Sequence, residues 1–147
     1  MYVTIIKTVS NLQDIPLLLI RLILAYGFYG PATMKLNDVG AIAEWFANIG
    51  VPAPTLNAYL ATYTEVAGVV LFILGLGTRF ISIPLIITMV VAIKTVHWEN
   101  GFNASDNGYE IPLYYITMLF TLFFFGAGRM SLDYFIGKRM QRAMPAR

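Results

Sequence analysis

Four long apolar stretches divide this chain, and shorter polar segments separate them. The apolar stretches run over about 15–36, 58–76, 80–96 and 111–128. A helix that crosses a bilayer needs roughly 20 mostly apolar residues, so each stretch predicts one transmembrane helix. The pattern therefore predicts an all-α integral membrane four-helix bundle. We expect a single domain over 1–147, with a basic tail at 129–147.

The segment between the first two stretches has a different periodicity. Ile42, Trp45, Phe46 and Ile49 recur at helical spacing, and the run Gly50–Pro54 then redirects the chain. This spacing predicts a short amphipathic helix over 39–49 that lies in the membrane interface. An ordinary structured loop is the alternative. A cleaved signal peptide is not expected at the first stretch, since Arg21 interrupts it and no small-x-small cleavage site follows.

Composition agrees with a membrane location and excludes several classes of function. The chain is 58% hydrophobic and 12% charged, whereas soluble domains carry about 25% charged residues. The net charge of +2, without a basic run with interleaved aromatics, predicts no nucleic-acid partner. Without cysteine and with a single histidine, the chain by itself is not expected to hold haem, an iron–sulfur cluster or zinc. His97 with Glu99, Asp106 and Glu110 fits no ligand motif, so we predict no metal site.

The distribution of Lys and Arg predicts the orientation of the spans. Positive residues concentrate on the cytoplasmic side of membrane proteins. If the four spans alternate, only Lys35 and Lys94 fall near one side, and the acidic loop residues lie there too. The opposite side holds Lys7, Arg79, Arg129, Lys138, Arg139, Arg142 and Arg147. We therefore expect a multi-pass protein of the inner (cytoplasmic) cell membrane, with both termini in the cytoplasm.

Each predicted span also carries an ionisable side chain, which costs roughly 3 kcal/mol or more at the centre of a bilayer. Such a group usually has a partner or faces a polar interior. Helical spacing gives each span one polar face, and we predict that these faces converge inside the bundle. The predicted faces are Arg21, Ala25, Phe28, Ala32 and Lys35 in the first span; Ala61, Glu65, Gly68, Phe72 and Gly75 in the second; Ile83, Ile87, Val90, Lys94 and His97 in the third; and Glu110, Tyr114, Thr117 and Thr121 in the fourth. The candidate residues for binding a substrate or quinone are Arg21, Lys35, Glu65, Lys94, His97, Glu110 and Tyr114. No residue is assigned a catalytic role.

Depth along the helices suggests which of these charges meet. At about 1.5 Å per residue, Glu65 lies roughly 10 Å and Arg21 about 20 Å from the outer end, so we predict an Arg21–Glu65 pair. The charged candidates carry one net positive charge when His97 is neutral, which favours a small anion or the carbonyls of a quinone. They are Arg21, Lys35, Lys94, Glu65 and Glu110. Alternatively, a buried Arg–Glu pair only fixes which helices pack together. Lys35 and Lys94 would then extend to the outer interface.

The order of several segments resembles the DoxX family of small four-helix membrane proteins. The first span, LLLIRLILAYGFYGPATMKL, carries Arg and ends in Lys, and AEWFANIGVPAP precedes the second span. The Glu-bearing TEVAGVVLFILGLGTRF follows, then GFN, NGYEIPL and finally FGAGRMSLD. The resemblance extends over nearly the whole chain. One departure is that the segment Tyr26–Pro31 lacks the histidine that the family often has late in the first span.

The resemblance implies a membrane component of an oxidoreductase system. It places Arg21, Lys35, Glu65, Arg79, His97 and Glu110 at the polar positions of the family pattern. A quinone or a small anionic or sulfur-containing substrate is the ligand class it implies, with redox centres supplied by partner subunits. A non-enzymatic scaffold, assembly factor or small conduit is the alternative. Besides the lipid bilayer, oxidoreductase subunits and further copies of this chain are left open as partners.

Overall fold

The computed structural model describes residues 12–143, and every regular element in that part of the chain is helical. The charges of Lys7 and Arg147, used in the predicted orientation, lie outside it. The α-helices are α2 (Asp14–Asn37), α3 (Val39–Asn48), α4 (Pro54–Leu74), α5 (Thr78–Ala92), α6 (Glu110–Phe125) and α7 (Leu132–Ala143). A π-helical turn (Ile93–His97) and a 3-10 turn (Trp98–Asn100) extend α5, and a second 3-10 turn (Ala104–Asp106) precedes α6.

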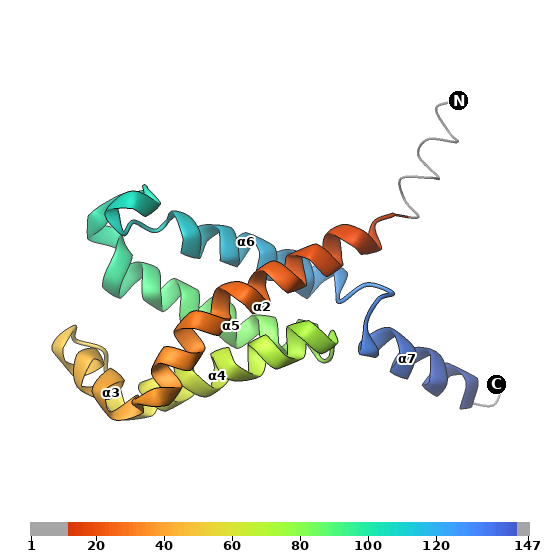
Figure 1. Cartoon of the computed structure of the whole chain (residues 1–147), viewed down its shortest axis with the longest axis horizontal. Coiled ribbons are helices and arrows are strands. Elements are labelled where there is room, and N and C mark those ends of the chain that lie inside the picture. Colours follow the sequence, from red (N-terminus) through yellow and green to blue (C-terminus); the bar gives the residue numbers. More distant parts are fainter. Residues whose placement is uncertain (1–11, 144–147) are drawn as a thin grey trace.

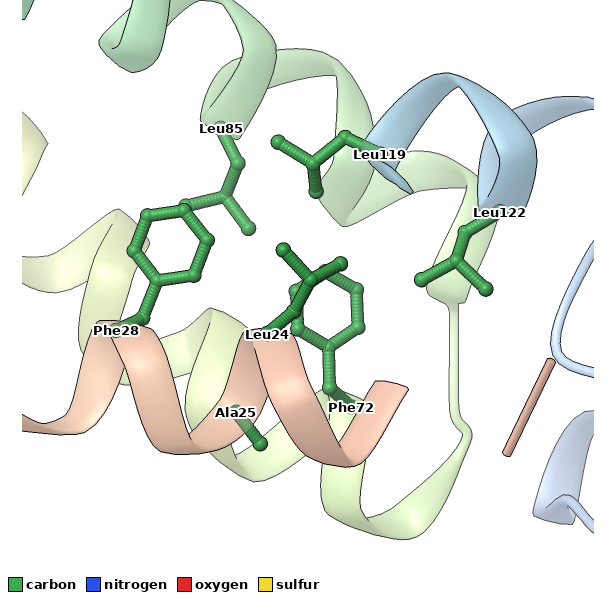
Figure 2. Close-up of a cluster of buried hydrophobic side chains, with 7 residues drawn as sticks. All are labelled: Leu24, Ala25, Phe28, Phe72, Leu85, Leu119 and Leu122. Atoms are coloured by element: carbon green, nitrogen blue, oxygen red, sulfur yellow. The ribbon is translucent and has the colours of Figure 1, made fainter. Parts of the chain in front are cut away.

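Helices α2, α4, α5 and α6 pack side by side, while α7 extends from one end (Figure 1). Helix α2 runs antiparallel to α4, and α5 lies against α6. Figure 2 shows the apolar side chains that meet between the four helices, which are Leu24, Ala25, Phe28, Phe72, Leu85, Leu119 and Leu122. Close approach depends on small residues, because a Cβ at Gly68 would lie 2.8 Å from a methyl group of Leu85.

The inner faces that we predicted for α2 and α4 are confirmed. Arg21, Ala25, Phe28 and Ala32 are the buried positions of α2 that belong to the predicted face. In α4, the buried set includes Glu65, Gly68 and Phe72. In both helices the polar residue is accompanied by small and aromatic residues, so its burial follows from close helix packing.

The inner faces that we predicted for α5 and α6 are wrong. Ile83, Ile87, Val90 and Lys94 lie on the outside of α5, which instead buries Thr78, Ser82 and Leu85. Helix α6 buries Pro112, Leu119 and Leu122, while Tyr114 and Thr117 are exposed. The hydroxyls of Thr117 and Thr121 donate to carbonyl oxygens four residues earlier in α6. Because these local bonds satisfy them, the hydroxyls need no partner in the interior.

Between residues 12 and 143, three helical segments are long and apolar enough to cross a membrane, as an integral membrane protein requires. They are Asp14–Asn37, Pro54–Leu74 and Thr78–Asn100. The fourth predicted span, 111–128, is shorter in the structure: α6 has 16 residues, because Gly126 at φ +78° ends it. At 1.5 Å per residue, α6 is about 24 Å long, against a hydrocarbon core of about 30 Å. A fourth crossing therefore stays a prediction.

The helix expected between the first two spans is present as α3. The side chain of Asp38 accepts a hydrogen bond from the backbone N–H of Ala41 and caps the first turn. Helix α3 packs against α4 and buries none of its own residues fully. Its position in the membrane interface stays a prediction.

Candidate functional site: a buried ion pair and an arginine clamp

A buried ion pair joins α2 to α4. The ammonium of Lys35, in the last turn of α2, lies 2.6 Å from each carboxylate oxygen of Glu65. The Lys35 side chain is 14% exposed and that of Glu65 is 1% exposed. Glu65 thus has its charge neutralised inside the protein, and Lys35 keeps a narrow access to the surface.

This pair corrects two predictions. The partner of Glu65 is Lys35 and not Arg21, and Lys35 does not simply extend to the interface. The reason is the direction of helical side chains, which lean toward the N-terminus of their own helix. Because α2 and α4 run antiparallel (Figure 1), Lys35 and Glu65 lean toward each other and meet. Arg21 leans the opposite way from Glu65 and reaches the carbonyl of Phe72. The heights of the Cα atoms, on which the predicted Arg21–Glu65 pair depends, do not include this direction.

Arg21 is buried at the other end of the bundle and binds only backbone oxygens. Its Nε donates to the carbonyl of Phe72 at 2.9 Å, and its Nη2 donates to that of Ile73 at 3.0 Å. Its Nη1 donates to Ala127 at 3.1 Å and to Met130 at 2.8 Å. The guanidinium thereby joins the C-terminus of α4, where helical carbonyls lack partners and the dipole is negative, to the segment that follows α6. We call this arrangement the arginine clamp.

Gly75 and Asp133 complete the arginine clamp. The sequence placed Gly75 on the inner face of the second span but assigned neither residue a role in a site. Gly75 has φ +65°, and a Cβ there would lie 2.5 Å from Nη2 of Arg21. The backbone N–H of Asp133 donates to the carbonyl of Gly75, and its carboxylate accepts from the N–H groups of Gly77 and Thr78 at the start of α5. The sequence did contain a sign of their importance, because both residues lie in segments on which the family resemblance rests, GLGT and GAGRMSLD.

The remaining candidates lie at the end of the bundle opposite the arginine clamp and do not form one cluster. Lys94 is exposed beside a shallow hollow of about 220 Å³ that Trp98 also lines. Nδ1 of His97 lies 2.7 Å from the carbonyl oxygen of Asn107. Glu110 accepts hydrogen bonds from the Tyr114 hydroxyl at 2.9 Å and from the N–H of Ala104 at 3.0 Å. These contacts organise the 97–110 loop, so the predicted convergence of all seven candidates is wrong.

A ligand role for these seven residues is still a prediction, although their positions are now defined. The structure brings together Lys35 with Glu65, and Glu110 with Tyr114. It leaves Arg21 in the arginine clamp, and Lys94 and His97 separate. Between residues 12 and 143, no three His, Asp or Glu side chains are close enough to hold a metal ion.

Comparison with known proteins places this geometry in a family. The model of the DoxX family matches residues 16–98. An uncharacterized protein of Haemophilus influenzae is 35% identical over 135 residues, which cover 86% of each chain. The putative oxidoreductase CatD of Bacillus subtilis is 29% identical over 85% of this chain and 90% of its own length.

A third relative supports the membrane assignment by its name. The uncharacterized membrane protein Rv3486 of Mycobacterium tuberculosis is 34% identical over 64% of each chain. No solved structure matches this chain. The match of the family model over more than half of the sequence, together with the apolar helices, shows that the chain is a membrane protein of the DoxX family.

Proposed function

We propose that this protein is the membrane subunit of an oxidoreductase system and binds a small polar ligand at the Lys35–Glu65 pair. The proposal is based on the burial of this pair together with the 14% exposure of the Lys35 side chain, which leaves Lys35 accessible to a ligand. An ammonium has three donors, so Lys35 can donate to the carbonyl of a quinone or to a small anionic or sulfur-containing substrate while it stays near Glu65. Ionisable groups at membrane depth are commonly functional.

The name of one relative supports the oxidoreductase part of the proposal. CatD, a putative oxidoreductase, aligns with 85% of this chain. This chain contains no cysteine and one histidine, so we assign the redox centres to partner subunits. The role of this subunit would then be to bind and orient the ligand within the membrane.

We further propose that the chain forms a single four-span domain with both termini in the cytoplasm of a cell with an inner membrane. The arginine clamp end of the bundle has the larger share of cations, and Lys35 and Lys94 belong to the opposite half of their helices. Fusion of a reporter that is active only in the cytoplasm should give signal at both termini. Signal at one terminus only would contradict an even number of spans.

A scaffold or assembly factor is the second candidate function. It is favoured by the arginine clamp, in which all four hydrogen bonds of Arg21 go to backbone oxygens of its own chain. In this alternative, the Lys35–Glu65 pair only fixes the packing of α2 against α4.

Ligand retention during purification distinguishes the two functions. Protein purified in mild detergent should release a bound quinone or small anion on solvent extraction, which mass spectrometry can quantify. Glu65→Gln should lose the ligand, while Glu44→Gln, at an exposed carboxylate of α3, should retain it. Circular dichroism checks that both variants keep their helices. Absence of any ligand from the wild type and both variants, with the helices intact, would favour the scaffold.

A further inference from the structure

A groove of about 710 Å³ opens at the arginine clamp end of the bundle, between α7 and the ends of α2, α5 and α6. We call it the end groove. Its walls include the apolar side chains Leu17, Phe80, Phe125, Ile136 and Met140. Arg79 and Arg129 line it as well. The end groove therefore combines an apolar surface with two guanidinium groups.

The end groove is held open by contacts that fix α7 to the bundle. The carboxylate of Asp133, in the first turn of α7, lies 2.8 Å from the N–H of Gly77. On the other wall, the side chain of Asp14 accepts from the N–H of Arg129 at 2.7 Å. These hydrogen bonds fix the first turn of α7 and the segment before it to the bundle, so the base of the end groove is part of the fold.

The charges around the end groove favour an anion. Five exposed cations lie there, namely Arg79, Arg129, Lys138, Arg139 and Arg142. In the part of this end that the structure describes, the two carboxylates are Asp14 and Asp133, and both already accept backbone N–H groups. Asp14 also lies 3.6 Å from Nε of Arg129, whose side chain nevertheless stays 61% exposed. Five cations against two carboxylates still leave an excess of positive charge. Arg79 donates to the carbonyl of Phe124 at 3.2 Å, and its guanidinium stays exposed. The unbalanced charge is therefore positive.

The surroundings of the end groove favour a lipid over a soluble anion. Phe80 is 80% exposed and Phe125 is 72% exposed, so the apolar walls continue onto the outer surface of helices that contact lipid. Helix α7 combines apolar with basic residues, which is the pattern of a helix that lies in the membrane interface. Its Ile136 and Met140 line the end groove. Its Phe135 is exposed, as are its basic residues.

We propose that the end groove binds an anionic phospholipid from the adjacent leaflet. Its phosphate lies near Arg79 and Arg129, and an acyl chain follows Phe80, Phe125 and Met140. Arginine suits this role because its planar donors match phosphate oxygens. The basic residues of α7 would contact neighbouring headgroups, which fits the attraction of basic juxtamembrane segments to anionic lipids.

Lipid binding to the purified full-length protein tests the proposal. Native mass spectrometry would compare phosphatidylglycerol with phosphatidylcholine, each added to the protein in detergent. We expect phosphatidylglycerol to be retained preferentially. The double variant Arg79→Gln/Arg129→Gln should weaken its binding about 10- to 30-fold, as expected for the loss of two interfacial cations. Lys94→Gln removes an exposed cation outside the end groove and should leave binding unchanged.

Several outcomes would overturn the proposal. Equal retention of the two lipids, or unchanged binding in the double variant, would show that the end groove does not select an anionic headgroup. Competition by inorganic phosphate as effective as by the lipid would indicate a soluble anion. A dimer that dissociates in the double variant without any lipid preference would indicate a second copy of this chain. If the double variant does not fold, Arg79→Lys/Arg129→Lys keeps both charges and should retain lipid selectivity.

Discussion

Replacement of Arg21 with methionine is expected to destabilise the protein by about 4 kcal/mol or more. The substitution removes four hydrogen bonds from a side chain that is 1% exposed, and it leaves four carbonyls in two chain segments without the guanidinium donor. Each buried polar group that loses its partner costs about 1–3 kcal/mol. Thermal unfolding in detergent, followed by tryptophan fluorescence, measures the loss. We expect little folded protein to survive purification.

Arg21→Lys tests whether the geometry of the guanidinium matters as well as its charge. Lysine offers a point charge on a flexible stem and cannot reproduce the planar array of donors that reaches four carbonyls. It should therefore recover only part of the lost stability. Lys94→Met removes an exposed cation from the other end and should change the unfolding temperature little. Wild-type stability of Arg21→Met would show that the arginine clamp does not hold the helices together.

Two glycines of the same turn provide a matched check on the arginine clamp. Gly75 and Gly77 have φ of +65° and +57°, so alanine at either position carries a similar backbone strain of roughly 1–2 kcal/mol. A Cβ at Gly75 would also meet Arg21, whereas a Cβ at Gly77 would meet no atom within 4 Å. Gly75→Ala should therefore lower the unfolding temperature clearly more than Gly77→Ala. Equal losses would contradict tight packing around Arg21.

The two partners of the ion pair are expected to respond unequally to substitution. Lys35→Met leaves the carboxylate of Glu65, 1% exposed, without its cation, and removal of one partner of a buried pair costs about 3–5 kcal/mol. Glu65→Gln leaves Lys35, which is 14% exposed and can turn toward water, so we expect a loss of only about 1–2 kcal/mol. Chemical or thermal unfolding of both variants gives the comparison.

A double-mutant cycle separates the pair from other effects of each substitution. In Lys35→Met/Glu65→Gln the carboxylate is gone, so the double variant should be more stable than Lys35→Met alone. This gain would show that most of the loss in the single variant comes from the unpaired charge. Additive losses would mean that Lys35 and Glu65 stabilise the protein independently, against the 2.6 Å contact. The same variants show whether ligand binding depends on the pair or only on folding.

The inner faces of α2 and α4 could be read from the sequence because their polar residues stand among small and aromatic ones. Spacing placed Arg21 with Ala25 and Phe28, and Glu65 with Gly68 and Phe72. Such residues leave one clear face for close packing, and the structure buries it. In α5 and α6 most side chains are apolar, so spacing could not distinguish the inside from the lipid side. The prediction followed the exposed Lys94 and Tyr114, whereas Thr78 and Ser82 mark the buried side of α5.

Residue types and their order determined that this chain is a helical membrane protein and to which family it belongs. They predicted four spans, whereas three helices between residues 12 and 143 are long and apolar enough to cross a bilayer. They also identified Arg21 and Glu65 as buried charges. Only the tertiary structure decided their partners, Lys35 for Glu65 and four distant carbonyls for Arg21. The physical reason is that burial depends on periodicity along one helix. Pairing depends instead on the direction in which side chains lean between antiparallel helices, and on which segments distant in the sequence pack beside them.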